Sequence, residues 1–150
     1  MSIILQDLLD HVTSHAQSTG YFDRVNQHEP KNAPGNGISC SVWVDHIQPV
    51  KSGLASTTVR VAFNVRLYSN MLQEPQDDID SKLTDALSAL IEAYSGDFQF
   101  DDTVQCIDLL GKEGISLSAR AGYVEQDKKM FRIYNITLPV LVNDAWDQKP

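Results

Sequence analysis

Hydrophobic and polar residues alternate along the chain from Thr57 to Tyr68, in the regular way that marks a β-strand. Successive side chains of a strand point to opposite faces, so one face of this segment is expected to pack into a core. The other face carries two arginines, Arg60 and Arg66, beside an asparagine and a tyrosine, and is expected to be presented to the surroundings. Such a face suits a protein that recognises another surface, and it indicates no particular reaction.

Shorter alternating patterns predict further strands. The strand expected at 38–50 is joined to the first by residues 51–56, a connection too short for a parallel crossover, so the two should form an antiparallel hairpin. The other expected strands are 21–25, 103–109, 116–125 and 130–142, with a hairpin turn at 127–129.

The expected strand 130–142 is apolar on both faces, which is typical of a strand that is covered on both sides. It should therefore be either central in the sheet or in contact with a neighbouring subunit through one face. Pro139 indicates that its end lies at a sheet edge, because proline has no N–H to donate to a ladder. The polar residues from about 143 onward predict a loose C-terminal tail.

Two segments have the apolar spacing of amphipathic helices. The first is expected at 3–18 and is stopped by Gly20, and the second is expected at 79–95, follows aspartates that can cap it, and is stopped by Gly96. The order of helices and strands predicts an α+β fold, with two helices packed on a mainly antiparallel sheet in a single domain over residues 1–150.

Composition and charge restrict the kinds of partner. Of the 150 residues, 42% are hydrophobic and 21% are charged, which are ordinary values for a globular protein. The net charge is −8, and acidic residues concentrate between Glu74 and Asp108, where Lys82 is the only basic residue. Such a surface repels phosphate backbones, so specific binding to DNA or RNA is not expected.

The cysteines and the N-terminus bear on the compartment. Cys40 and Cys106 lie in apolar alternating segments, where a free thiol acts as a small hydrophobic residue in a reducing compartment, so we do not expect a disulfide between them. The N-terminal apolar run follows no basic residue and is interrupted by acidic residues, unlike a signal peptide. No apolar run has the length of a membrane span, so a cytoplasmic site of synthesis and no membrane partner are expected.

No constellation of residues predicts a catalytic, cofactor or metal site, so we do not expect an enzyme. His11 and His15 have the spacing of two ligands on a helix, but the sequence HVTSH lacks the glutamate of the HExxH zinc motif, and no third ligand is suggested nearby. The adjacent pairs His28–Glu29 and Asp45–His46 have no serine or cysteine nucleophile in a recognisable turn.

Candidate interaction residues lie in expected loops, on the presented face and in the tail. Loops seldom expose leucine and methionine without a partner, although such side chains often tuck beneath their own loop. The two arginines could pair with acidic residues of an adjacent copy, and the tail tryptophan could dock on a partner or fold back on its own domain. The candidates are Leu54, Arg60, Arg66, Asn70, Met71, Leu72 and Trp146.

Three segments resemble the tail terminator proteins of long-tailed bacteriophages that infect actinobacteria: HEPKNAPGNG (28–37), SGLASTTVRVAFNVRLYSNMLQEPQDDID (52–80) and LPVLVNDAWDQ (138–148). The similarity extends over roughly residues 21–148. Tail terminators are small α+β proteins that form a ring, commonly hexameric, on the head-proximal end of a finished tail tube. The resemblance implies a structural protein of the virion tail or neck, assembled in the host cytoplasm, which stops tube polymerisation and presents a joining surface to the head.

The resemblance also implies partners: other copies of this chain, the tail tube protein and the head–tail connector proteins, with DNA passing through the channel without specific binding. We hypothesise that the final strand supplies subunit contacts and that the loops 51–56 and 69–76 supply docking surfaces. Acidic residues, among them Asp97, Asp101 and Asp102, would line the channel.

Two other functions are compatible with the sequence. The first is a head-completion or connector protein of the neck, which contacts the portal side. The second is a small cytoplasmic ligand-binding protein whose polar groups converge only in the folded structure.

Overall fold

The sheet is built on three long strands, each with the alternating pattern of its sequence. The computed structural model describes residues 5–28, 37–52, 56–70, 79–97, 106–126 and 128–147. The long strands are β2 (Ile38–Ser52), β3 (Ser56–Asn70) and β6 (Lys129–Asp147). The short strands β1 (Arg24–Asn26), β4 (Cys106–Ile107) and β5 (Ser118–Gln126) complete a six-stranded sheet in the order β1-β2-β3-β6-β4, with β5 also paired to β6.

Strand directions agree with the sequence analysis. β1 runs parallel to β2, and every other pairing among the described strands is antiparallel. β2 and β3 form the expected antiparallel hairpin, and β5 returns into β6 through a turn in which Lys128 has a φ of 64°. The predicted mainly antiparallel sheet is confirmed.

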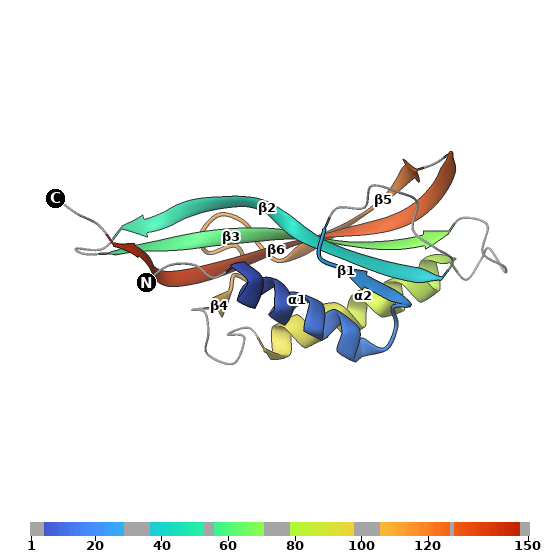
Figure 1. Cartoon of the computed structure of the whole chain (residues 1–150), viewed down its shortest axis with the longest axis horizontal. Coiled ribbons are helices and arrows are strands. Elements are labelled where there is room, and N and C mark those ends of the chain that lie inside the picture. Colours follow the sequence, from blue (N-terminus) through green and yellow to red (C-terminus); the bar gives the residue numbers. More distant parts are fainter. Residues whose placement is uncertain are drawn as a thin grey trace.

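Two helices, α1 (Leu5–Thr19) and α2 (Ile79–Gly96), cover one face of the sheet side by side (Figure 1). Both agree with their predicted ranges to within two residues. α1 ends at Gly20, whose φ of 76° lies in the left-handed region that glycine adopts without strain. α2 turns a regular apolar stripe toward the sheet, formed by Ile79, Leu83, Ala86, Leu90 and Tyr94.

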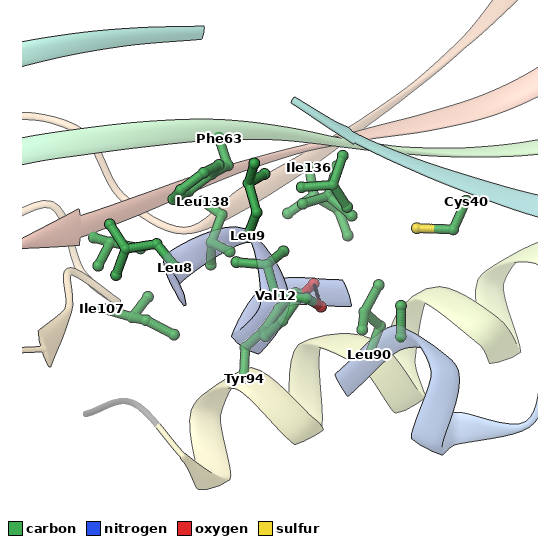
Figure 2. Packing of buried hydrophobic residues seen from close by; sticks show 14 of the residues in the cluster. Leu8, Leu9, Val12, Cys40, Phe63, Leu90, Tyr94, Ile107, Ile136 and Leu138 are labelled. Atoms are coloured by element: carbon green, nitrogen blue, oxygen red, sulfur yellow. Dashed lines mark hydrogen bonds between the residues drawn. The ribbon is translucent and has the colours of Figure 1, made fainter. Parts of the chain in front are cut away.

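The main core lies between the helices and the face of β3 that was predicted to be buried. Figure 2 shows Phe63 of β3 and Leu138 of β6 above Val12 of α1, with Tyr94 of α2 beside them. The hydroxyl of Tyr94 is buried in this core and donates a hydrogen bond of 3.1 Å to the Val12 carbonyl, which joins the two helices. The fully buried residues on this face of β3 are Val59, Val61, Phe63, Val65 and Leu67.

β6 is central rather than at an edge, so the expectation drawn from Pro139 is wrong. β6 pairs with β3 along one side, and with β5 and then β4 along the other. Pro139 lies between the stretch paired with β5, which ends at Thr137, and the stretch paired with β4, which begins at Val140. The missing N–H therefore faces a gap between two partners, and the Pro139 carbonyl there accepts the Asp108 N–H at 3.0 Å.

The C-terminal segment also differs from the expectation. A loose tail was predicted from about residue 143, but β6 continues to Asp147. Its backbone pairs with the start of β3, where Thr57 is the partner of Trp146 and Ser56 is the partner of Asp147. The polar composition of this segment predicted a tail, because composition alone does not show that the distant strand β3 pairs with its backbone.

Replacing Phe63 by alanine should lower the free energy of unfolding by about 3–5 kcal/mol, because the deletion leaves a cavity in a core that is closed on all sides. Urea unfolding followed by circular dichroism measures this loss. Ser88→Ala, on the exposed side of α2, is the matched control and should change stability by less than about 0.5 kcal/mol. A Phe63→Ala loss as small as that of the control would contradict the placement of this core.

Candidate interaction surfaces

The face of the sheet opposite the helices, called here the far face, has a covered end and an open centre. It carries the second alternating set of β3, from Arg60 to Tyr68. At one end Tyr68 and Phe131 of β6 meet edge to face with their ring centroids 6.3 Å apart, and both are buried. Ile133 and Val124 extend this second apolar cluster into the β5–β6 hairpin.

Arg60 is not presented, contrary to the expectation from the alternating pattern. It is 5% exposed, and it donates a hydrogen bond of 2.9 Å to the Glu113 carbonyl and one of 2.7 Å to the Gln48 side chain. A buried guanidinium requires such partners, because the unpaired charge would be costly to remove from water. Arg60 therefore fixes a loop of its own chain onto the far face.

Arg66 remains partly accessible at the centre of the far face. Its guanidinium lies 5.1 Å from the ring centroid of Trp43 and 6.0 Å from that of Tyr68, and Nε donates to Asn135 at 3.3 Å. Cation–π contacts with two rings hold the arginine in one orientation. The result is a flat polar and aromatic surface, which Asn64 and the exposed Asp45 extend through a hydrogen bond of 3.3 Å.

The loop fixed by Arg60 spans residues 108–117 and is tightly organised. The buried carboxylate of Asp108 accepts the N–H groups of Lys112 at 2.8 Å and Glu113 at 2.9 Å. Gly111 and Gly114 allow the turns, with φ values of 76° and 116°. This arrangement leaves Leu110 93% exposed.

An ion pair also ties the 108–117 loop to the end of β2. Lys51 Nζ lies 2.7 Å from Glu113 Oε1, and this hydrogen bond raises the pKa of Lys51. The first residue of the predicted docking loop 51–56 therefore contacts its own chain. Residues 53–55, which include Leu54, lie outside the described residues.

Most of the other predicted interaction residues fall outside the part of the chain that the structure describes. Met71 and Leu72 lie in the range 71–78, which is not described. For Asn70 and Trp146 the backbone is described, and both are paired within the sheet, opposite Phe131 and Thr57 respectively. The loop predicted at 69–76 is described only for its first two residues, which belong to β3.

Of the three aspartates expected to line a channel, one is described by the structure and two are not. Asp97 is three-quarters buried and pairs with His15, with Oδ2 and Nε2 2.8 Å apart. Asp101 and Asp102 lie outside the described residues. Asp97 therefore connects the end of α2 to α1, and this contact places His15 edge to face against Tyr94.

The β5–β6 hairpin bends away from the helix layer at one end of the sheet (Figure 1). Ser118, Ala119, Arg120 and Ala121 of β5 are all exposed. Among the described strands, β5 has no neighbour on its outer edge.

Arg132 both braces this hairpin and ties it to the body of the protein. Its guanidinium stacks on Tyr123 of the neighbouring strand at 4.4 Å, and its Nε donates to Asp80 at the start of α2 at 2.9 Å. This hydrogen bond raises the pKa of Arg132.

A shallow groove lies between the helices on their side away from the sheet. Its volume is about 300 Å³. It is lined by His15, Ser18 and Thr19 of α1 and by Ala89, Glu92 and Ala93 of α2.

The side chain of Cys40 is fully buried in the main core. Burial raises the pKa of Cys40 to about 12, so its thiol is protonated at neutral pH and acts as a small apolar residue. Cys40 and Cys106 are both free thiols, in agreement with the prediction.

Within the described ranges, no three His, Cys, Asp or Glu side chains gather closely enough to hold a metal ion. None of the described helices is long and apolar enough to cross a membrane.

Comparisons with known proteins give likenesses to solved structures but no match by sequence. No protein-family model matches the chain, and no curated protein sequence matches it significantly. A similar solved structure is the sheath/tube terminator of PVC, an extracellular contractile injection system, in its extended state. The two chains are 12% identical with a TM-score of 0.48, and the alignment covers 99% of this chain and 60% of that one. A likeness at this level does not by itself assign a function.

Replacing Asp108 by alanine should loosen the 108–117 loop, because two backbone N–H groups lose a charged acceptor. We expect the free energy of unfolding to fall by about 1.5–3 kcal/mol and the amides of Lys112 and Glu113 to exchange faster with deuterium. Asp108→Asn, which keeps one acceptor oxygen and the same size, should lose less. Unchanged exchange at both amides in the alanine variant would show that Asp108 does not organise the loop.

Proposed function

We propose that this chain is a structural, non-catalytic protein of a bacteriophage tail. A ring of identical copies, commonly hexameric in the family that the sequence resembles, caps the head-proximal end of the tail tube and ends its polymerisation. The ring then offers a joining surface to the head connector, and DNA passes through its channel without specific binding. The proposal is supported by the resemblance of the three sequence segments, and by the agreement of the observed α+β fold with the fold that this resemblance implies.

The observation that carries the proposal is the open edge of the β5–β6 hairpin. An edge strand presents a row of unpaired N–H and C=O groups, which can pair with a strand of another protein. β5 has no proline, and its pairing with β6 proceeds without a register shift from Ser118 to Gln126. An edge without such protection is a surface for assembly.

The opposite edge of the sheet is protected in several ways. β1 covers β2 at residues 39–41, and β2 has register shifts after Val44 and after Pro49. Bulges and proline on an edge strand discourage pairing with other chains. The contrast between the two edges favours β5 as the strand that meets the tube.

Exposed apolar side chains add to the hairpin surface. Tyr123 is 60% exposed, and Met130, two residues along the returning strand from its register partner Arg132, is 46% exposed. Aromatic and methionine side chains are enriched at the centres of protein interfaces. The hairpin thus combines backbone groups for strand addition with apolar side chains that stabilise it.

Removing the gene from the genome that encodes it tests the function directly. Negative-stain electron microscopy of the lysate should show filled heads beside unattached, overlong tubes, because nothing ends tube polymerisation. Tails of normal length that fail to join heads would instead support the neck-connector function. Ordinary infectious particles would contradict both functions.

The role of the hairpin is tested by Ala121→Pro. In an antiparallel ladder the N–H groups of a strand point alternately to one side and to the other. Counted from the pair Gln126–Lys129, which closes the turn, the Ala121 N–H is expected to point to the outer edge of β5. Proline at this position should therefore block strand addition without breaking the β5–β6 pairing. We expect purified tubes to remain uncapped when mixed with this variant. Ala121→Val, which retains the N–H, is the control and should cap them. Equal capping by both variants would exclude the β5 edge as the contact with the tube.

A further inference from the structure

Leu110, the most exposed of the large apolar side chains described, lies on the 108–117 loop, which several contacts hold in place. Asp108 fixes the backbone of this loop from within, and Arg60 and Lys51 fix it from the sheet. An apolar side chain on a mobile loop would lose conformational freedom on binding, whereas one on a rigid loop is already positioned. This combination is typical of an anchor residue that enters a pocket on a partner.

The groove between α1 and α2, called here the helix groove, has room for such an anchor. Its volume of about 300 Å³ is ample for one leucine side chain. Ala89 and Ala93 leave the space open on α2, and Thr19 closes the other side from α1. The groove faces away from the sheet, because the opposite side of α2 is the buried one.

We propose that Leu110 of one copy inserts into the helix groove of a neighbouring copy, and that this contact repeats around the ring. The inference rests on the proposed function, since it names the interface that would build the proposed ring. The partner is a second copy of this chain.

Charge complementarity favours a second copy of this chain as the occupant of the groove. Lys112 lies two residues from Leu110, is exposed, and makes no ion pair with any described residue. Glu92 lies in the lining of the groove, is exposed, and is likewise without an ion pair in the described part of the chain. Insertion of Leu110 would bring the two charges together. An attractive pair is needed here because two copies with a net charge of −8 repel each other.

The positions of the two surfaces determine the symmetry of the contact. Arg60 holds the 108–117 loop to the far face through Glu113, and the groove lies on the outside of the helix layer, with the sheet between the two contacts. We therefore expect Leu110 to reach the groove of another copy rather than that of its own chain. A two-fold dimer would have to bring both surfaces of each copy into one interface, whereas a head-to-tail contact uses one surface from each copy and generates a ring or a filament.

Cysteine cross-linking tests the contact and its direction. Leu110→Cys and Ala93→Cys are prepared separately in a Cys106→Ser background, with the fully buried Cys40 left in place. Under oxidation, an equal mixture of the two variants should give disulfide-linked dimers, and the double variant should give a ladder of larger species. The mixture is oxidised both at high protein concentration and on tube ends, because a tube end can hold together copies that associate only weakly in solution.

Two outcomes of the cross-linking overturn the inference. Dimers formed by Leu110→Cys alone, as efficiently as by the mixture, would show that the loops meet each other. An absence of cross-links in the mixture under both conditions would show that the groove is not the partner of Leu110. Tube capping is scored separately by microscopy: cross-links without capping contradict the tube function alone, and capping without cross-links contradicts this contact alone.

Substitutions give a quantitative check that does not depend on cysteine chemistry. Leu110→Ala should weaken self-association by about tenfold to a hundredfold, and Lys112→Glu by about tenfold, as measured by sedimentation. Adding Glu92→Lys to Lys112→Glu reverses both charges and should restore association. Lys82→Glu, an equal charge change at an exposed position near the start of α2, is the matched control. Failure of the double reversal to restore association, with the control at the wild-type level, would exclude the pairing of Lys112 with Glu92.

Discussion

The pairing of β3 with β6 is the interaction on which the rest of the structure depends. It runs from Ser56 opposite Asp147 to Asn70 opposite Phe131, along the whole of β3. Because the side chains of a strand alternate with a period of two, a slip of one residue would turn Arg66 into the helix core and Val65 onto the far face. The fully buried row of β3 fixes the register, and the register in turn decides which residues face the helices and which lie on the far face.

The two faces of this central pair are covered by different means. The helices cover one face with apolar side chains, as expected for an α+β domain. The far face is covered in part by the 108–117 loop, which requires polar contacts because a loop has backbone groups to satisfy. Asp108 and Arg60 supply these contacts, and both are more than nine-tenths buried. Arg60 was expected to take part in recognition, but Arg60 and Asp108 instead stabilise the fold of their own chain.

The spacing of hydrophobic and polar residues predicted the features that depend on neighbours in the sequence. The helices, the β2–β3 hairpin and the buried face of β3 follow from spacing within a few turns or residues, and all were predicted. The central place of β6 was one of two alternatives, and it is decided by the strands that pair along its two sides. The burial of Arg60 and the exposure of Leu110 depend on which distant segment covers the far face. Leu109 is half-buried against the core whereas Leu110 is exposed, and nothing in two adjacent leucines distinguishes them. The available signal was the sequence DLLGKEG, in which an aspartate and two glycines mark a tight turn.

The acidity of the chain bears on how its copies would assemble. Identical chains of net charge −8 repel one another, and this repulsion acts over roughly 8 Å at physiological salt. An interface built on one inserted leucine and one ion pair is weak for an isolated pair of copies. In a closed ring each copy makes the contact twice, and a tube end that holds the copies close together raises their effective concentration. If the proposed function and contact are right, weak contacts between acidic copies would favour assembly at a tube end over assembly in free solution, as a protein that acts only on finished tubes requires.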